Sequence, residues 1–436
     1  MTHQEKAGRS VRVGELTRVE GEGSLRVDVD DGQVTEVALE IFEPPRYFEA
    51  LLVGRHLSEA PDITARICGI CPVVYQMSAC AAMEQACGVV VDERIWALRR
   101  LLYCGEWIQS HALHVYLLHA PDFLGCQDGA ELAERQPEAV RRGLELKRMG
   151  NRLMEQVGGR AIHPVNVRVG GFFSAPTRES ISALAEPLRR ALDAALLTVE
   201  WAAGFEFPDV TADYRFVALR QPGTYPIERG RPASSDGLDL SPSEFAAAVE
   251  EEHVARSTAL QARLKDRGSY LTGPLARYSL NSQLLTPLAG EAASRAGLGS
   301  ECRNPFRSIL VRAVELVVAC EEALSLVEAY VPPDPSSITL EPPASPTTGT
   351  GATEAPRGLL LHTYEVGADG LIRRARIVAP TSQNQLVMEQ DVRRVAQASL
   401  HLPDDELTHR CEQAVRNHDP CISCAAHFLD VTVARR

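Results

Sequence analysis

Apolar and polar positions alternate with a period of two in two short regions, one near each end of the chain. Residues 11–42 show this alternation on both sides of an Asp30-Asp31-Gly32 turn, and residues 359–378 show it around Ala368-Asp369-Gly370. Alternation interrupted by an Asp-Gly turn is typical of antiparallel strand pairs. The pattern therefore predicts two β-hairpins.

Between the hairpins, apolar positions mostly recur every three or four residues, and this period predicts helices. Proline steps at Ser241-Pro242 and Asn304-Pro305 mark two helix starts. The predicted helices cover residues 48–54, 72–88, 92–119, 136–157, 178–203, 242–264, 305–330 and 386–400. Residues 332–356 are rich in Pro, Ser, Thr and Gly and predict a linker. The expected fold class is α+β, a mainly helical body with small β units near both termini. We expect one domain over residues 1–436.

Composition and charge are those of an ordinary globular protein. The 436 residues are 45% hydrophobic and 24% charged, with a formal net charge of −13, so a large core is possible. The negative charge argues against nucleic acid or an anionic membrane as the main partner. No run approaches the roughly 18 apolar residues of a spanning helix, and the polar start of the chain is not that of a signal peptide. We expect a cytoplasmic protein without a membrane span.

Four of the eleven cysteines form two Cys-x-x-Cys pairs, Cys68 with Cys71 and Cys421 with Cys424. Two thiols at this spacing can point at one centre from a single turn. Thiolates are soft ligands that suit zinc, iron or nickel. If both pairs hold one metal, the two ends of the chain meet at that centre. The other seven cysteines mostly stand among Ala, Leu and Val, as small buried hydrophobic residues do.

Three kinds of site fit two such pairs. A structural zinc site usually closes over roughly 15–20 residues, whereas about 350 positions separate these pairs. A dithiol–disulfide couple of the thioredoxin kind needs a βαβ setting, and neither pair has one. The third possibility is a catalytic metal centre with all four thiolates at the junction of the two chain ends.

Further motifs accompany the cysteine pairs. The pairs themselves stand in Arg66-x-Cys68-Gly69-x-Cys71 and Asp419-Pro420-Cys421-x-x-Cys424-x-x-His427. The others are Arg18-Val19-Glu20-Gly21, Arg46-x-x-Glu49 and Ala355-Pro356-Arg357-Gly358-x-Leu360-x-His362. With these five motifs in this order, the chain resembles the large, catalytic subunit of nickel–iron hydrogenases from about Leu16 to His427. The short length and the Arg-Ile-Cys-Gly-Ile-Cys-Pro segment resemble the cytoplasmic, bidirectional branch that couples to NAD(P).

The resemblance implies an oxidoreductase that splits H2 heterolytically and reversibly at a nickel–iron centre carrying cyanide and carbon monoxide. In the family the first cysteine of each pair binds nickel alone, here Cys68 and Cys421, and the second, here Cys71 and Cys424, bridges nickel to iron. The alternative is a hydrogen-sensing or complex-I-like electron-transfer subunit of the same fold. Proteins of that fold that do no hydrogen chemistry lack the four cysteines, whereas this chain has all four.

Family roles carry over to three further residues. Cys421 is a candidate first proton acceptor, and Glu20 matches the glutamate that takes the proton onward. Arg357 matches the arginine beside the diatomic ligands of the iron, where its planar fork of donors suits a cyanide nitrogen. Thr381 matches the residue that hydrogen-bonds the other cyanide.

A second, smaller metal site is also implied. Glu49, His427 and a backbone carbonyl just before Pro380 match its ligands, for magnesium or iron. Two positions depart from the family pattern, because Tyr75 stands where a histidine is common and Ser110 where an aspartate is common. His111, His114 and His163 are either groups near the centre or core histidines.

Electrons need a route that this sequence does not contain, because it has neither a Gly-x-Gly-x-x-Gly fingerprint nor a ferredoxin-type cysteine run. The implied partners are a small iron–sulfur subunit and flavin-containing NAD(P) reductase subunits. A maturation protease is implied as well, which would remove residues 428–436 after His427.

Overall fold

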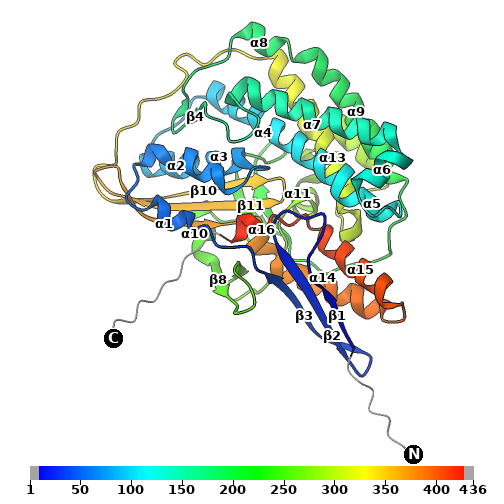
Figure 1. Cartoon of the computed structure of the whole chain (residues 1–436). Helices are drawn as coiled ribbons and strands as arrows, with labels where there is room; N and C mark the ends of the chain where they lie inside the picture. The colour runs from blue at the N-terminus through cyan, green and yellow to red at the C-terminus, as the bar shows by residue number, and fades with distance from the viewer. Residues whose placement is uncertain (1–8, 427–436) are drawn as a thin grey trace, which may run out of the picture.

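A layer of long helices forms one side of the protein in the computed structural model, which describes residues 9–426 (Figure 1). Helix α4 (Glu93–Leu113) packs against α7 (Pro137–Gly158), and α13 (Ser308–Glu328) packs against both α4 and α9 (Ala185–Ala203). The residues of α13 from Ser308 to Cys320 are all buried. A helix that is covered all round in this way is a core helix, and α13 is the centre of this layer.

A three-stranded antiparallel sheet lies below the helical layer in Figure 1, with helix α3 (Pro72–Ala86) along one face. Its strands are β10 (Thr347–Ala355), β11 (Gly358–Val366) and β12 (Ile372–Val378) in that order. Two glycines of β10 allow α3 to approach the strand closely. A Cβ on Gly349 would lie 2.0 Å from the carbonyl oxygen of Ala82, and one on Gly351 would lie 2.3 Å from that of Ser78. Only glycine fits at these two contacts.

The N-terminal sheet consists of β1 (Arg9–Val13), β2 (Gly23–Asp30) and β3 (Gln33–Ile41). Helix α14 (Pro380–Ser399) packs against β3, and α15 (Asp404–Arg416) packs against β1. The short helix α16 (Ile422–Ala425) follows and packs against α14 in the middle of the molecule (Figure 1). The segment around Glu20, which follows β1, therefore meets the segment around Cys421 at the junction of the helical layer and the two sheets.

The remaining elements are short. Residues His114–His119 continue α4 as a π-helical turn. The other helices are α1 (Phe48–Leu52), α2 (Ala60–Thr64), α5 (Ala120–Phe123), α6 (Gly129–Arg135), α8 (Arg178–Ser182), α10 (Pro242–Ala248), α11 (Pro274–Asn281) and α12 (Pro287–Arg295). Three antiparallel strand pairs complete the fold: β4 (Val167–Arg168) with β5 (Gly171–Phe172), β6 (Val217–Arg220) with β7 (Arg231–Ser234), and β8 (Val249–His253) with β9 (Leu260–Leu264).

The α+β prediction is confirmed, and both predicted hairpins are present. The helix predicted over 242–264 is wrong after Ala248, because β8 pairs with β9 from Val249↔Leu264 onward. Ala262 and Leu264 are buried at every second position, and Arg263, which points the other way, pairs with Glu250 and Glu252 at 3.4 Å each. The buried positions of this segment therefore repeat every two residues, as in a strand, with the charged Arg263 between them.

The linker predicted over 332–356 is wrong from Thr347 onward, because β10 is a buried strand. Its glycines and threonines, which suggested a linker, allow the contact with α3. Helix α15 was not predicted at all, because charged residues surround its few buried apolar positions at Leu407, Cys411, Ala414 and Val415. The single-domain organisation remains a prediction.

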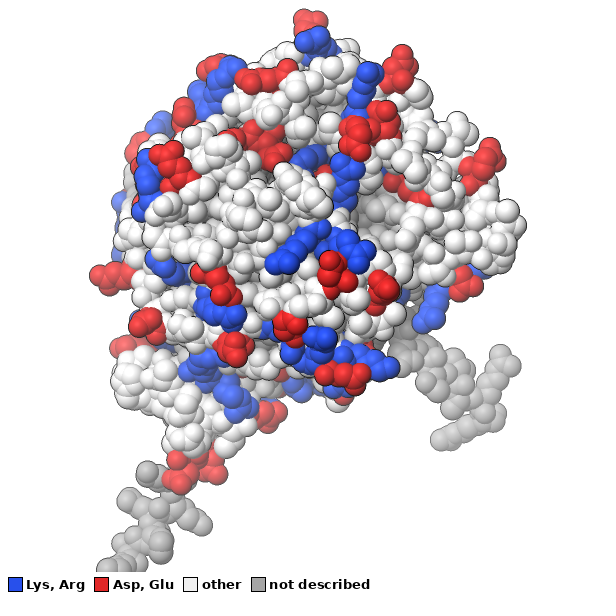
Figure 2. Space-filling model, turned by 180° about the vertical axis from the view of Figure 1, so that it is seen from behind, with Lys and Arg blue, Asp and Glu red and all other residues white. Residues whose placement is uncertain are grey.

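On the face opposite to that of Figure 1, basic and acidic side chains lie interspersed, without a field of one sign (Figure 2). Within residues 9–426, no helix combines the length and the apolar character that a bilayer crossing needs.

Candidate metal centre

The four predicted thiol ligands converge on one point. Cys68 and Cys71 stand just before α3, and Cys421 and Cys424 lie at and within α16. Their sulfur atoms all lie within 4.8 Å of one another, with 3.5 Å between Cys68 and Cys421 and 3.8 Å between Cys71 and Cys424. Each of the four residues is at most 3% exposed. Segments far apart in sequence thus form a closed, all-sulfur site that suits a soft metal.

A carboxylate from the helical layer fixes the start of α3 beside Cys71. Cys71 is the N-cap residue, but its side chain makes no capping hydrogen bond. Instead Glu106 of α4, which is fully buried, accepts hydrogen bonds from the backbone nitrogens of Val73 (2.6 Å) and Val74 (3.3 Å). It satisfies donors that the first turn of a helix leaves free. The Cys68–Cys71 turn is therefore held between α3 and α4.

The thiols influence one another's ionisation. Hydrogen bonds with Cys421, Cys424 and Cys71 hold the pKa of Cys68 well below its usual value. Burial instead raises the pKa of Cys71, Cys421 and Cys424. The four thiols therefore differ in how readily each loses its proton. A bound metal ion keeps coordinating thiols deprotonated, so a metal would remove the cost of the remaining charges.

Arg357 lies near the thiols and has one guanidinium nitrogen without a partner among the described residues. Its side chain is buried, with Nε donating to the Asp419 carbonyl (2.9 Å) and Nη2 donating to Asp419 Oδ1 (3.1 Å). Nη1 is buried and has no hydrogen-bond partner among the described residues. Burial lowers the pKa of Arg357, but the nearby Asp419 and the thiols of Cys421, Cys71 and Cys68 raise it more, so that it lies well above its usual value. A buried donor without an acceptor is costly, and an acceptor ligand on a metal would satisfy it.

Two further predicted residues contact Cys421. Thr381, at the start of α14, accepts a hydrogen bond from the Cys421 backbone nitrogen at 2.9 Å. Glu20 pairs with Cys421 as an isolated β-bridge, and its Oε2 lies 3.1 Å from the Cys421 sulfur. The same oxygen accepts from the Ser423 nitrogen at 3.1 Å. The Glu20 carboxyl group is therefore the acid–base group in direct contact with a predicted ligand.

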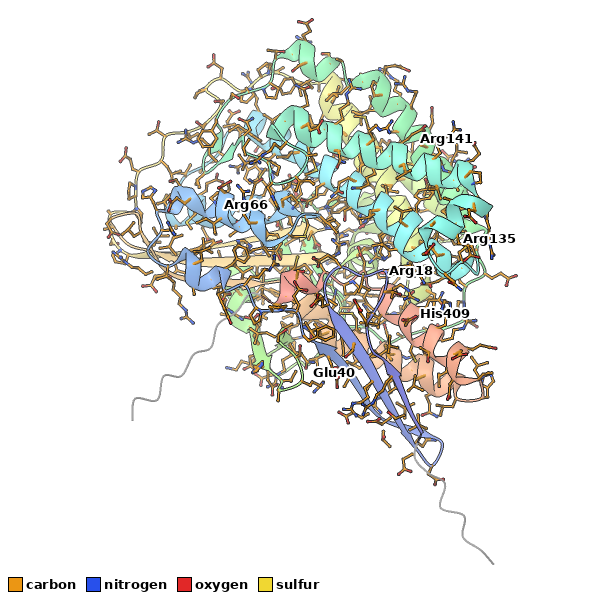
Figure 3. All side chains as sticks on the ribbon, viewed as in Figure 1. Arg18, Glu40, Arg66, Arg135, Arg141 and His409 are labelled. Atoms are coloured by element: carbon orange, nitrogen blue, oxygen red, sulfur yellow. The ribbon has the colours of Figure 1, made fainter. Side chains whose placement is uncertain are left out.

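Asp122 joins the segments near the two chain ends at this place, and no motif indicated it. It is buried between Arg18, at 2.5 Å, and Arg416, at 2.8 and 3.0 Å. Arg18 lies where the N-terminal sheet meets the helical layer, with His409 nearby (Figure 3). Although burial raises it, Arg416 and Arg18 hold the pKa of Asp122 below its usual value. Asp122 thereby anchors the segments that carry Glu20 and Cys421.

The two departures from the family pattern both lie close to the centre. Tyr75 is buried, and its ring stacks obliquely on His362 at 5.6 Å. Burial and the neighbouring thiols of Cys424 and Cys71 raise the pKa of Tyr75 well above its usual value, so its hydroxyl stays protonated and remains a donor. The Ser110 hydroxyl is buried without a hydrogen-bond partner in the described part of the chain.

The three histidines have different surroundings. His111 lies 3.0 Å from Glu315, and His114 contacts the Arg416 carbonyl at 3.0 Å. Both are buried within the helical layer. His163 is only half-buried, in the loop after α7, and its pKa is lowered by burial and by Arg66.

The second metal site is described only in part. Glu49 on α1 accepts a hydrogen bond from the backbone nitrogen of Ile377 at 2.6 Å. Glu49 is therefore held beside the end of β12, and β12 leads directly to Pro380. His427 lies outside the described residues, as does the predicted removable segment 428–436. This site remains a prediction.

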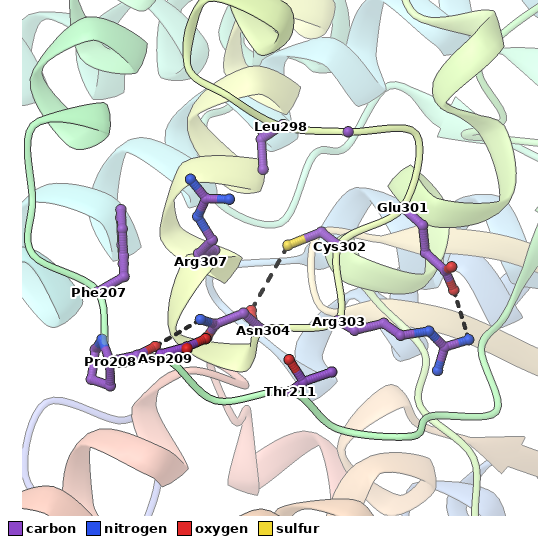
Figure 4. A pocket seen from close by; sticks show the side chains of 11 residues that line it. Phe207, Pro208, Asp209, Thr211, Leu298, Glu301, Cys302, Arg303, Asn304 and Arg307 are labelled. Atoms are coloured by element: carbon purple, nitrogen blue, oxygen red, sulfur yellow. Dashed lines mark hydrogen bonds and ion pairs between the residues drawn. The ribbon is translucent and has the colours of Figure 1, made fainter.

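One hollow on the surface lies apart from the thiols. It measures about 470 Å³ and lies between residues 207–211 and 298–307 (Figure 4). Its polar groups are engaged with neighbours, because Arg303 pairs with Glu301 at 2.7 Å and Asn304 donates to the Pro208 carbonyl at 2.7 Å. None of the predicted site residues lines it.

A family model described as nickel-dependent hydrogenase matches residues 46–142 and 276–427. These ranges include all four cysteines. The chain belongs to the nickel-dependent hydrogenase family. It is 33% identical over 421 residues to sulfhydrogenase 1 subunit alpha of Pyrococcus furiosus, which covers 96% of this chain and 98% of that protein.

Other relatives of this hydrogenase subunit are similar over their whole length. The beta subunit of the NAD-reducing hydrogenase HoxS of Cupriavidus necator is 30% identical over 474 residues, covering 97% of this chain and 95% of that protein. A crystal structure of an NAD+-reducing [NiFe]-hydrogenase in the H2-reduced state superposes with a TM-score of 0.86 at 29% identity, covering 96% of this chain and 99% of that chain.

The prediction of a nickel–iron hydrogenase catalytic subunit, an oxidoreductase, is therefore confirmed. The alternative, a sensing or complex-I-like subunit, receives no support from these relatives. The buried group of four cysteines and the unpaired Arg357 nitrogen fit a nickel–iron centre.

Proposed function

We propose that this hydrogenase subunit passes the electrons of H2 to NAD(P) through partner subunits. Hydrogen cleavage at this site is supported above all by the convergence of four buried thiols with Glu20 and Arg357. The acceptor is supported by the full-length similarity to an NAD-reducing hydrogenase subunit and by the fold of an NAD+-reducing enzyme.

The four thiolates of Cys68, Cys71, Cys421 and Cys424 would together hold the nickel–iron centre. When bound, the centre supplies the heterolytic cleavage of H2 and takes up its two electrons. The protein keeps the site dry, because all four side chains are buried, and in such a site fixed charges act strongly.

Glu20 would carry the proton away from the centre. Its Oε2 already lies at hydrogen-bond distance from the Cys421 sulfur, so a proton released there needs no rearrangement to reach the carboxylate. The Ser423 nitrogen holds this oxygen in place. Since Glu20 is only half-buried, it can pass the proton on toward solvent or a partner.

Arg357 and Thr381 would orient the diatomic ligands. The paired side of the Arg357 guanidinium is fixed on Asp419, which leaves Nη1 to donate to one cyanide. The Thr381 hydroxyl accepts from the Cys421 nitrogen, and its own proton is then available to the other cyanide. Glu49, His427 and a carbonyl before Pro380 would hold magnesium or iron near the C-terminal motif.

The electron route requires partners. We propose a small iron–sulfur subunit next to this chain and flavin-containing NAD(P) reductase subunits beyond it, in the cytoplasm, where these nucleotides are used. A maturation protease would remove residues 428–436 once nickel is bound.

The experiment that tests the acceptor is purification of the complete complex through a tag on this chain. We expect H2-dependent reduction of NAD+ or NADP+ by that complex, and copurification of flavin and iron–sulfur subunits. Reduction of an artificial dye but of neither nucleotide, at full nickel occupancy, would leave the hydrogenase in place and contradict the proposed acceptor.

A further inference from the structure

Arg277, on α11, is fully buried and uses its whole donor fork. Nε and Nη2 donate to the two oxygens of Glu315, both at 2.8 Å, and Nη1 donates to Glu354 at 2.9 Å. Nη1 also donates to the carbonyl of Ala355 at 2.7 Å, and Nη2 to that of Pro356 at 2.9 Å. Two of its five hydrogen bonds therefore hold the two residues directly before Arg357.

The carboxylates that hold Arg277 are themselves fixed by the helical layer. Glu315 of α13 accepts a hydrogen bond from the Tyr225 hydroxyl at 2.8 Å and lies 3.0 Å from His111 of α4. Glu354 accepts from the Leu219 nitrogen at 2.7 Å. Such bidentate arginine–carboxylate pairs are the strong and directional ones, so Arg277 has one defined position.

Aromatic packing adds to this restraint. The guanidinium carbon of Arg277 lies 4.5 Å from the ring centroid of Trp107, a distance typical of a cation–π contact. The Trp107 indole nitrogen donates to the Glu354 carbonyl at 3.2 Å. Helix α4 therefore supports the segment before Arg357 both directly and through Arg277.

The chain just before α11 contacts Arg357 itself. Gly273 has φ +110°, and a Cβ there would lie 2.7 Å from the Arg357 carbonyl oxygen. Arg277 of α11 and the preceding Gly273 therefore contact the backbone on the two sides of the Pro356–Arg357 bond. On the far side, the Arg357 side chain is held only by Asp419, which leaves Nη1 without a partner among the described residues.

We propose that Arg277 is a positioning residue that clamps the Ala355-Pro356 turn and so fixes the direction in which the Arg357 guanidinium points. The proposal rests on the role given to Arg357 above. Arg277 does not touch the centre; its own contacts are Glu315, Glu354, the two carbonyls and Trp107. Its effect on hydrogen turnover therefore passes through Arg357.

The test is Arg277→Lys in the complete complex, read by nickel content and by the infrared cyanide bands as well as by turnover. A lysine keeps the charge but offers a compact ammonium that cannot serve both carboxylates and both carbonyls. We expect nickel to stay bound, the cyanide bands to shift, and kcat to fall at least tenfold with little change in KM. Unshifted bands with kcat within twofold of the parent would overturn the proposal.

Arg99→Lys is the matched control, because Arg99 is equally buried and is bidentate to Glu84, at 2.9 and 2.5 Å, away from the Arg357 turn. It should lower thermal stability without moving the cyanide bands.

If Arg277→Lys does not assemble, Glu354→Gln is tested with the same measurements, because its amide cannot accept hydrogen bonds from both Arg277 and the Leu219 nitrogen. Unshifted bands and unchanged kcat in that variant would also overturn the proposal.

A double variant separates this proposal from its premise. In an Arg357→Lys background, Arg277→Lys should cause little further loss, because its effect passes through the same side chain. Losses that multiply would show that Arg277 acts elsewhere. If Arg357→Lys alone shifted no band and cost no turnover, the role of Arg357 would fall first, whatever Arg277 does.

Discussion

Arg357→Lys is expected to leave the metal centre assembled and to reduce hydrogen turnover by about 100-fold or more, as is common when one preorganised donor is removed from a reaction site. The guanidinium fork serves Asp419 with two nitrogens and leaves a third for the centre. A lysine ammonium is a single point and cannot hold Asp419 in this way while also filling the place of Nη1.

The measurement is dye-linked H2 oxidation at matched nickel content. Arg99→Lys again serves as control, since it breaks an equally buried arginine–carboxylate pair without touching the thiols. Stability should fall in both variants, but turnover only in Arg357→Lys. Turnover close to that of the parent would remove Arg357 from the mechanism.

Glu20→Gln should lower the rate of exchange between deuterium gas and solvent protons by about 10²–10⁴-fold. The nickel content should not change. The glutamine oxygen can still accept from the Ser423 nitrogen, as Glu20 does at 3.1 Å, so the local structure should persist. An amide cannot take up and release the proton that the Cys421 sulfur presents at 3.1 Å. The loss would therefore be one of proton transfer.

Glu40→Gln provides the matched control. Glu40 is a carboxylate of the N-terminal sheet, where it lies on β3 and contacts Ser24 and Arg26 (Figure 3). Exchange in this variant should equal that of the parent. Normal exchange in Glu20→Gln would mean that another group relays the proton.

The sequence predicted the local elements well where period and turn residues agree. Both hairpins around Asp-Gly turns and the long helices α4, α7, α9 and α13 were found in this way. It failed where tertiary contacts decide the conformation. Glycines and threonines look like a linker until α3 packs on β10, and the Leu260–Leu264 strand is stabilised by its pairing with β8.

For the site, motif resemblance named residues that the structure brings together, including four cysteines, Glu20, Arg357 and Thr381. It did not indicate Glu106, an ordinary charged residue within a predicted helix, or Asp122, which follows the end of that helix. Their roles come from partners far away in sequence, Arg18 and Arg416 for Asp122 and the start of α3 for Glu106. Spacing alone does not reveal such long-range pairs.

We propose that the four thiols of Cys68, Cys71, Cys421 and Cys424 hold a nickel–iron centre with cyanide and carbon monoxide on the iron. The most direct measurement is an infrared spectrum of the purified active complex together with its nickel and iron content. We expect cyanide and carbon monoxide stretching bands and one nickel per chain, and we expect the bands and the nickel to be lost when Cys421 is replaced by alanine. Full occupancy by zinc, with neither band present, would contradict it.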